Sequence, residues 1–359
     1  APPACAKNHI TVGALNSNDD SVTGFTSWGP TDDGRIKPDI STAGCQSDDD
    51  FGVTSCSSSG GYTSKCGTSM ASPTACGISA LIMEDYRNQY PELPEMANSM
   101  LKALLAHTAV DGGNPGPDCQ YGYGSIRARE AIDHLRIGSF IETDISQNES
   151  YSFLVVVPEN AASFQATAAW DDVPAEPLIV NSLVNDIDVI VLDPSGSRHY
   201  PWTIDPSDPS APATRDAEDH LNNIEQVTVE SPMPGIWQVE IRGTTVTDDA
   251  QLVSVTTTPE LIDCSSSGIV SLDRSVYPLE GALVARVVDC DLNTDDFEIE
   301  TVEILLTSSA GGDVEPLLLV ESGEATSEFV GTMPHSTVDG PGTLLVADGT
   351  VIEASYDDA

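Results

Sequence analysis

The amino-acid sequence predicts an α/β region followed by two all-β regions. Residues 1–138 combine a short apolar strand with three segments of helical hydrophobic periodicity. The remaining residues show short alternating strands separated by turn residues, with no helical period. A length of 359 residues is enough for two or three domains. We therefore expect an α/β domain at 1–138, an all-β barrel or jelly roll at 139–258 and an immunoglobulin-like β-sandwich at 259–359.

The α/β region is expected to contain one buried strand and three helices. The run HITVGA at residues 9–14 is short and apolar, as in parallel strands that are buried on both faces. A Gly/Pro-rich loop is expected over residues 25–44. Amphipathic patterns then predict helices at 71–87, 97–109 and 127–135. Four apolar residues mark the expected buried side of the first helix: Ala75, Ile78, Leu81 and Ile82.

The strands of the two all-β regions are predicted from short alternating apolar and polar runs. In the first region they are expected at 151–157, 164–170, 187–192, 227–229 and 237–241. In the second region they are expected at 269–272, 282–288, 301–306, 316–320, 343–346 and 351–354. Because no helix is predicted to cover these strands, the sheets must pack against each other or close into barrels.

The chain is strongly acidic. It carries 57 Asp and Glu residues against 14 Lys and Arg residues, which gives a net charge of −43. Such a surface repels nucleic-acid phosphates and anionic membranes, so neither is expected as a partner. The charge suits a protein dissolved in salty or calcium-rich water, where counterions screen its self-repulsion. The sequence contains no apolar run long enough to span a bilayer.

Eight cysteines, an even number, indicate an oxidising compartment. We therefore expect an extracellular protein, either secreted or held at a cell surface. Cys264 and Cys290 lie alone in the last region, and we expect them to pair with each other. Cys76 falls in the helix predicted at 71–87, where a buried free thiol and a disulfide are both compatible with the sequence. The pairing of the others cannot be read from the sequence: Cys5, Cys45, Cys56, Cys66 and Cys119.

The stretch GTSMASP, residues 67–73, places a serine directly before the first predicted helix. Ser69 would then lie where unpaired backbone N–H groups and the positive end of the helix dipole face a substrate. A serine in that position can attack a carbonyl carbon while nearby N–H groups bind the developing oxyanion. Gly67 allows another backbone to approach closely, and Pro73 is expected to fix where the helix begins. The alternative is an ordinary serine N-cap.

Three motifs in this order resemble those of the subtilisin-like serine proteases, the subtilases. GTSMASP resembles the family's nucleophile motif, and FTSWGP at 25–30 and DGRIKPD at 33–39 resemble two motifs that precede it. Three ordered motifs are far more specific than any one of them. The resemblance implies the C-terminal portion of a subtilisin-like α/β catalytic domain. It also implies a serine endopeptidase that acts on protein or peptide substrates, with Ser69 as the nucleophile.

Segments of the second region resemble the C-terminal β-barrel of some alkaline subtilases. They are NDID at 185–188, DPSG at 193–196 and NNIEQV at 222–227. The resemblance to this subgroup extends from residue 1 to about residue 258.

The other catalytic groups of a subtilase match no residue of this sequence. None of the six histidines is followed by Gly, as in the family's H-G-T motif, and no D-[ST]-G triplet precedes Ser69. Asn8 adjoins the first predicted strand but does not match the motif of the family's oxyanion-binding Asn. His9 precedes Ser69, yet its place at the start of a strand favours packing or solvent exposure over a role as base.

We therefore expect the base, its orienting Asp and the oxyanion-binding Asn in upstream sequence. The N-terminal half of the catalytic domain would then be a partner of this chain. Loss of the base lowers turnover on the order of 10⁶-fold, so the chain alone is expected to be inactive. The alternative is a non-catalytic secreted binding or adhesion protein, a pseudoprotease that kept a subtilase segment. The intact motif at 67–73 argues against this alternative.

Calcium is the one cofactor that the sequence indicates, because its acidic motifs offer hard oxygen ligands. One set of candidate ligands lies in the barrel motifs: Asp186, Asp188, Asn223 and Glu225. A second set alternates in the last region: Asp289, Asp291, Asn293 and Asp295. The second spacing imitates an EF-hand loop, but Thr294 stands where that loop requires Gly, so a solvated acidic turn is the alternative. No spacing of Cys and His typical of zinc sites is present.

Overall fold

The structure is a computed structural model that divides into two compact units, Ala1–Ile262 and Asp263–Ala359. It describes residues 3–46, 52–176, 179–247, 249–259, 261–262, 269–272, 276–289, 292, 299–321 and 328–356. The first unit contains both the predicted α/β region and the predicted barrel region. The boundaries predicted at residues 138 and 258 stay predictions.

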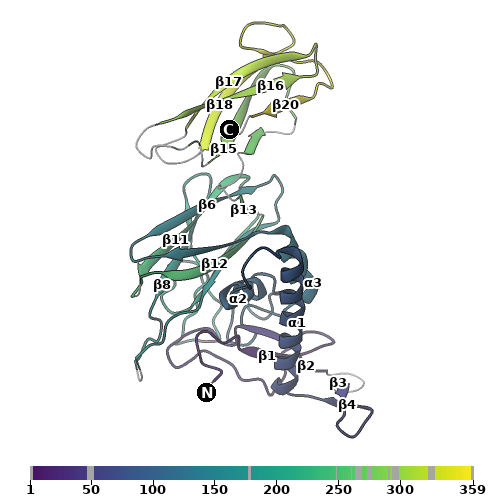
Figure 1. Ribbon diagram of the computed structural model, residues 1–359, viewed down its shortest axis with the longest axis vertical. Coiled ribbons are helices and arrows are strands. Elements are labelled where there is room, and N and C mark those ends of the chain that lie inside the picture. The colour runs from purple at the N-terminus through teal and green to yellow at the C-terminus, as the bar shows by residue number, and fades with distance from the viewer. Residues whose placement is uncertain are drawn as a thin grey trace. The chain divides into compact units, whose positions relative to one another are not determined.

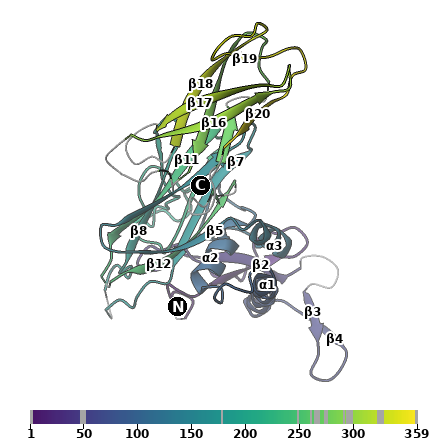
Figure 2. The same ribbon diagram turned by 45° about the horizontal axis from the view of Figure 1, so that its top comes forward.

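The α/β part of the first unit consists of a parallel strand pair and three helices (Figure 1). The strands are β1 (Val12–Asn16) and β2 (Ile40–Cys45), and the helices are α1 (Thr68–Gln89), α2 (Asn98–His107) and α3 (Ala128–Ile137). Helix α1 packs against both strands, as Figure 2 shows from a second direction. The three predicted helices are confirmed, with ends that differ by a few residues.

Two expectations for the strands were wrong. The first strand begins at Val12 rather than at residue 9. The segment expected to end a Gly/Pro-rich loop instead forms β2, whose residues Ile40, Ser41 and Thr42 are buried. The hydrophobic pattern does not predict this strand because its sequence, ISTAGC, consists mostly of small residues. Small residues let α1 approach β2 closely, and they give no apolar alternation.

The core of this part lies between α1, α2, α3 and the strand pair. Its largest buried side chains include Ile40, Ile82, Tyr86, Met100, Leu104, Leu105 and Leu135. In α1, Ala75 and Ile82 are buried as predicted and Ile78 packs against the core. Leu81 was predicted to be buried but is 52% exposed. One residue along a helix is a rotation of about 100°, which carries Leu81 off the face that Ile82 occupies.

A two-stranded hairpin precedes α1. Its strands are β3 (Val53–Cys56) and β4 (Tyr62–Lys65), which among the described residues pair only with each other. Most of their side chains are exposed. Figures 1 and 2 both show the hairpin projecting away from the rest of the α/β part.

One disulfide, Cys45–Cys66, is present among the described residues. Cys76 carries a free thiol, but this thiol is exposed on α1 and not buried. The remaining free cysteines in the described part of the chain are Cys5, Cys56 and Cys119. The predicted pair of Cys264 and Cys290 lies outside the described residues.

The all-β part of the first unit contains two antiparallel sheets, with strand orders β10-β7-β12-β5 and β13-β6-β11-β8-β9. The strands are β5 (Phe140–Ile145), β6 (Ser150–Val157), β7 (Ser163–Trp170), β8 (Asp186–Leu192), β9 (Arg198–His199), β10 (Ile224–Glu230), β11 (Gly235–Thr245), β12 (Gln251–Thr258) and β13 (Leu261–Ile262). Trp170, Phe164 and Trp237 are fully buried in one core shared by both sheets. All five predicted strands are confirmed, and the jelly-roll connectivity stays a prediction.

The second unit is a single sheet in the described residues. Its order is β14-β15-β18-β17-β16-β20, and β19 pairs with β18. The strands are β14 (Ile269–Leu272), β15 (Gly281–Val288), β16 (Thr301–Ser308), β17 (Asp313–Glu321), β18 (Glu328–Ser336), β19 (Leu344–Leu345) and β20 (Ile352–Ser355). The prediction missed β18 because it contains Gly331 and Pro334, two residue types that argue against a strand. The all-β prediction is confirmed, and the immunoglobulin-like arrangement stays a prediction.

None of the described helices combines the length and the hydropathy that a membrane crossing requires.

The α/β and all-β parts of the first unit meet through a polar contact between two histidines and a row of threonines. The rings of His107 on α2 and His134 on α3 lie 4.7 Å apart between centroids. Nδ1 of His107 lies 2.9 Å from the Thr167 hydroxyl. Nε2 of His134 lies 2.7 Å from the hydroxyl of Thr256. Burial lowers the pKa of His134 to about 4, and burial together with the neighbouring His134 lowers the pKa of His107 well below its usual value.

We expect this histidine pair to destabilise the first unit in acid. The unfolded chain takes up a proton near pH 6.5, whereas folded His134 does so only near pH 4, so stability is lost as pH falls between these values. The expected loss from His134 is about 2–3 kcal/mol. Urea unfolding between pH 4 and pH 7 measures it. His134→Gln should flatten this pH dependence, while His9→Gln, a change at an exposed histidine, should not. An unchanged slope in His134→Gln would contradict the assignment.

Candidate active site

Ser69 lies at the exposed N-terminal end of α1 as its second residue. The residue before the helix is Gly67, with φ 156° and ψ 159°. This backbone conformation is essentially restricted to glycine, so a side chain at position 67 would be strained. Glycine is thus favoured at position 67 by the backbone conformation, in addition to the room that it leaves for a neighbouring chain.

The hydroxyl and the backbone N–H of Ser69 are both available. Among the described residues, neither group has a hydrogen-bond partner, and no side chain caps the helix. Ser69 is therefore not the ordinary N-cap that the sequence left open, because the capping position belongs to Gly67. An exposed hydroxyl beside free N–H groups at a positive helix end can attack a carbonyl and bind the resulting oxyanion.

Pro73 does not fix the start of α1, contrary to the prediction. The helix begins at Thr68, and Pro73 lies inside it. Proline has no N–H to donate to the carbonyl of the residue four positions before it, and that residue is Ser69. The first turn begins instead with the N–H groups of Met70 and Ala71, which donate to the Gly67 carbonyl at 2.9 Å and 3.3 Å.

The motif at residues 33–39 joins the two strands next to α1. The ammonium of Lys37 contacts both carboxylate oxygens of Asp39 at 2.6 Å and 2.8 Å. Asp39 Oδ2 also accepts the N–H of Thr11, just before β1, at 2.6 Å. Burial lowers the pKa of Lys37, and the opposite charge of Asp39 works against this shift. The motif therefore has a structural role beside the nucleophile.

An open cavity of about 690 Å³ adjoins the start of α1. Its lining includes Thr68 next to Ser69, Trp28 and Pro30 of the motif at residues 25–30, and Arg35. A volume of this size falls within the range of ligand-binding sites.

The histidines do not pair with Ser69. His107 and His134 lie against threonines of β7 and β12, His199 contacts Asp193, and His335 packs edge-on against Tyr277. His9 is exposed to solvent. Because Ser69 has no hydrogen-bond partner in the described part of the chain, the structure holds no Ser–His pair at this helix end.

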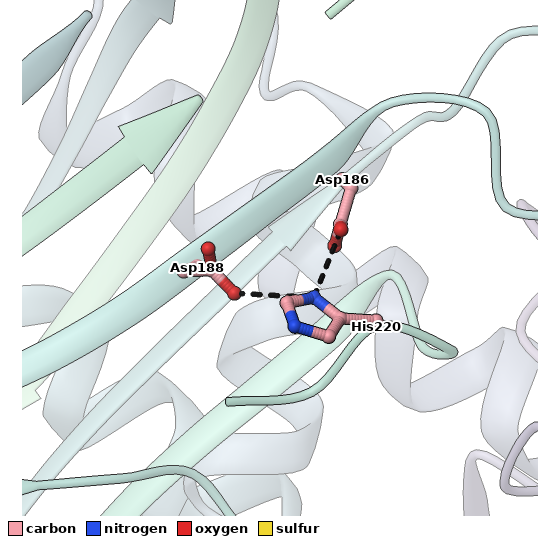
Figure 3. Close-up of side chains that lie close together, drawn as sticks. All are labelled: Asp186, Asp188 and His220. Atoms are coloured by element: carbon pink, nitrogen blue, oxygen red, sulfur yellow. Dashed lines mark ion pairs between the residues drawn. The ribbon is translucent and has the colours of Figure 1, made fainter. Parts of the chain in front are cut away.

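A second group of chemically reactive side chains lies in the all-β part. Figure 3 shows the imidazole of His220 between the carboxylates of Asp186 and Asp188, both on β8. Nδ1 of His220 is 2.9 Å from Asp186 and 3.5 Å from Asp188. Arg242 lies 3.0 Å from the other oxygen of Asp188. Asp186 and Asp188 come together because alternate residues of a strand share one face.

Among the described residues, three buried carboxylate oxygens of this region have no hydrogen-bond partner: Asp186 Oδ1, Asp188 Oδ1 and Glu225 Oε1. Asp188 Oδ1 makes the 3.5 Å ion-pair contact with His220. Asp188 and Glu225 are fully buried. Burial raises the pKa of Asp186 to about 6, and burial followed by the nearby Asp219 and Asp188 raises the pKa of Glu225 well above its usual value. Burial also raises the pKa of Asp219. A buried carboxylate oxygen without a hydrogen-bond partner is costly, and a cation that it coordinates would offset this cost.

These residues fit a hard divalent cation such as calcium. The unpaired donors are all carboxylate oxygens, the ligand type that calcium prefers. Asp219 and His220 were not among the predicted ligands, although they lie three and two positions before the NNIEQV segment. A small cavity of about 210 Å³ is lined by Asp219 and His220.

The other predicted calcium ligands lie elsewhere or outside the described residues. The side chain of Asn223 turns away from the acidic cluster: its amide donates to the Trp170 carbonyl at 2.7 Å and its oxygen lies 3.3 Å from the Lys102 ammonium. Asp289 is buried and accepts a hydrogen bond from the hydroxyl of Tyr356. Asp291, Asn293 and Asp295 lie outside the described residues.

Most of the α/β part is similar in sequence to known proteins. Residues 1–124 match the subtilase family. Serine protease/ABC transporter B family protein tagA of Dictyostelium discoideum is 27% identical over 263 residues, 64% of this chain and 15% of that protein. Serine protease AprX of Bacillus subtilis is 32% identical over 152 residues, 37% of this chain and 31% of AprX. C5a peptidase of Streptococcus pyogenes is 36% identical over 87 residues, 24% of this chain and 7% of that protein.

The chain thus spans less than a third of the length of these curated relatives. The matched residues 1–124 contain Ser69, the two motifs before it, and the helices α1 and α2. The chain is therefore a subtilase-like protein, related to a family of serine proteases through residues 1–124.

Proposed function

We propose that this chain belongs to a serine-type endopeptidase in which Ser69 is the nucleophile. The observation that carries the proposal is the exposed N-terminal end of α1, where the hydroxyl and N–H of Ser69 have no partner among the described residues. The subtilase match over residues 1–124 supports the same chemistry. The substrates would be proteins or peptides.

In the proposed reaction, Ser69 Oγ attacks the carbonyl carbon of the scissile peptide bond while a histidine takes its proton. The N–H of Ser69 donates to the oxygen that becomes negatively charged. The same histidine then protonates the leaving amine, and water releases the acyl group from Ser69. The base, the Asp that orients it and a second oxyanion donor, an Asn, would come from the N-terminal half of the catalytic domain. This chain alone would then be inactive.

We also propose that calcium binds the acidic cluster of the all-β part. Asp186, Asp188 and Glu225 would hold the ion through their unpaired oxygens, with Asp219 close by. Bound calcium would favour the ionised form of Asp186 and Glu225, the two carboxyl groups whose pKa burial raises. It would therefore act on stability and not on the peptide-bond chemistry. The net charge of −43 and the Cys45–Cys66 disulfide support an extracellular location.

The alternative is a secreted binding or adhesion protein without catalysis. The absence of a Ser–His contact among the described residues is compatible with it. Upstream sequence separates the two proposals, because a pseudoprotease should show a degraded H-G-T or D-[ST]-G motif.

The direct test is labelling with a fluorophosphonate probe, which reacts only with activated serines. The probe is applied to this chain alone and to the full-length parent polypeptide, and the labelled residue is found by peptide mapping. We expect label on Ser69 in the parent and none in the isolated chain. Label on the isolated chain would mean that one of its own histidines acts as base, with His9 first to be examined. A folded but unlabelled parent would exclude the protease and leave the binding protein.

A further inference from the structure

The chain returns to the end of β2 immediately before the proposed nucleophile. Cys45, the last residue of β2, forms a disulfide with Cys66, although 21 positions separate them in the sequence. The next residue, Gly67, donates its N–H to the carbonyl of Gly44 at 2.9 Å. One covalent bond and one hydrogen bond therefore join neighbouring residues of the two segments, and Ser69 follows two residues later.

The end of β2 and the start of α1 are tightly packed against each other. A Cβ atom added to Gly44 would lie 2.7 Å from the Ala14 side chain, 2.9 Å from the Gly67 carbonyl and 3.1 Å from the Ala71 side chain. Ala14 and Ala71 are fully buried. The end of β2 and the first turn of α1 thus meet through backbone and methyl groups, and a shift of Cys66 or Gly67 would move the amides around Ser69.

The segment that the disulfide closes includes the β3–β4 hairpin, whose strands pair with no other strand in the described part of the chain. Its strands are largely exposed, and Figures 1 and 2 show it standing away from the α/β part. A Cβ atom added at Gly60 or Gly61 in its tip would meet nothing within 4 Å. Without an anchor, movement of this hairpin would reach Ser69 through only Cys66, Gly67 and Thr68.

From these contacts we infer that Cys45 and Cys66 are positioning residues for Ser69. Their disulfide holds the Gly67–Met70 turn against β2, so that the nucleophile keeps its place while the hairpin moves. The inference rests on the proposed function of Ser69, which it deepens. The hairpin can change or be cut without loss of catalysis, whereas removal of the disulfide lowers catalysis. Exact placement matters because an error of about 1 Å at a reacting group can cost 10²-fold in rate.

The first test uses this chain alone and needs no activity. Amide hydrogen exchange is compared between the wild type and the variant C45A/C66A. We expect faster exchange at Gly67, Met70 and Ala71, whose N–H groups bond across or within the junction, and unchanged exchange in α2. Cys76→Ala, an exposed free cysteine on the same helix, is the matched control and should change nothing. Equal protection of the junction with and without the disulfide would overturn the inference.

A second measurement covers the case in which C45A/C66A does not fold. A protease cleavage site is inserted between Gly60 and Gly61, and the folded chain is cut there. We expect protection at Gly67, Met70 and Ala71 to survive the cut and to fall once a phosphine reduces the disulfide. Protection lost on cutting alone, or kept after reduction, would overturn the inference.

The third test separates positioning from general structural support in the full-length parent. Active sites are counted with the fluorophosphonate probe, and kcat is expressed per titrated site. For C45A/C66A we expect kcat per site to fall 10- to 100-fold with KM changed by less than about threefold, and Cys76→Ala to match the wild type. A merely structural role would reduce the number of titratable sites and leave kcat per site unchanged, which would contradict the inference. An unlabelled wild-type parent would overturn the proposed function itself, while the exchange experiments still decide whether the disulfide holds the turn.

Discussion

Ser69→Ala in the full-length parent should lower kcat on the order of 10⁶-fold, to the level left by binding and oxyanion stabilisation alone. The reason is that the variant has no atom at this position that can form the acyl-enzyme. Peptide hydrolysis and fluorophosphonate labelling measure the loss. Because the Ser69 side chain is exposed and has no partner among the described residues, the unfolding temperature should not change.

Ser72→Ala is the matched control for this experiment. Ser72 is an exposed serine in the first turns of the same helix, so the substitution makes the same chemical change without touching the proposed nucleophile. We expect full activity and full labelling in Ser72→Ala. Activity that persists in Ser69→Ala would contradict the assignment of the nucleophile and shift attention to another serine.

Calcium should stabilise the first unit strongly at pH 8 and only weakly at pH 5. Asp186 has a pKa of about 6 in the folded chain against 3.8 in the unfolded chain. The folded state therefore binds more protons, and without calcium its stability falls as pH rises through this range. Glu225 contributes a loss in the same direction, because burial raises its pKa well above the usual value. Calcium binds the ionised carboxylates, so its stabilising effect should grow with pH.

The expected size of the effect at pH 8 is about 4 kcal/mol when calcium is present at 1,000 times its dissociation constant. Thermal or urea unfolding with calcium and with a chelator measures the difference. Isothermal titration of the folded chain with calcium gives the dissociation constant directly. Neither measurement depends on proteolytic activity.

Glu225→Gln is the most specific test of the predicted calcium effect. Glutamine has nearly the shape of the protonated glutamic acid that burial favours, so stability without calcium should be retained. It lacks the negative charge, so the calcium effect should be largely lost. Asp205→Asn, a change at an exposed aspartate outside the cluster, should leave the calcium effect intact. A full calcium effect in Glu225→Gln would show that the ion binds elsewhere.

The acidic cluster and the histidine pair act in opposite directions over an overlapping pH range. Protonation of the unfolded chain at His134 lowers stability as pH falls from 6.5 to about 4. The raised pKa of Asp186 instead lowers stability as pH rises toward about 6. The variants His134→Gln and Asp186→Asn therefore separate two contributions that would partly cancel in the wild type.

Local sequence was enough to locate Ser69, because a helix N-terminus is encoded by residues that are neighbours in the chain. Gly67 takes a backbone conformation that other residues avoid, and the apolar residues of α1 follow at helical spacing. Asp186 and Asp188 could also be grouped from sequence alone, since alternate residues of one strand share a face. Five strands of the first all-β region followed from the same alternation, whereas β5, β9, β12, β13 and β18 were not predicted.

Contacts between distant segments were decided only by the tertiary structure. Asn223 lies two residues from Glu225, yet its amide bonds to the Trp170 carbonyl and not to the acidic cluster. His220 joins Asp186 and Asp188 because the loop before β10 reaches β8, which no spacing in the sequence encodes. The disulfide partner of Cys45 could not be predicted from the sequence either. A disulfide or a cluster of ionisable side chains forms only where distant backbone segments come together, and packing across the whole unit decides which segments meet. The start of a helix depends only on the few residues around it.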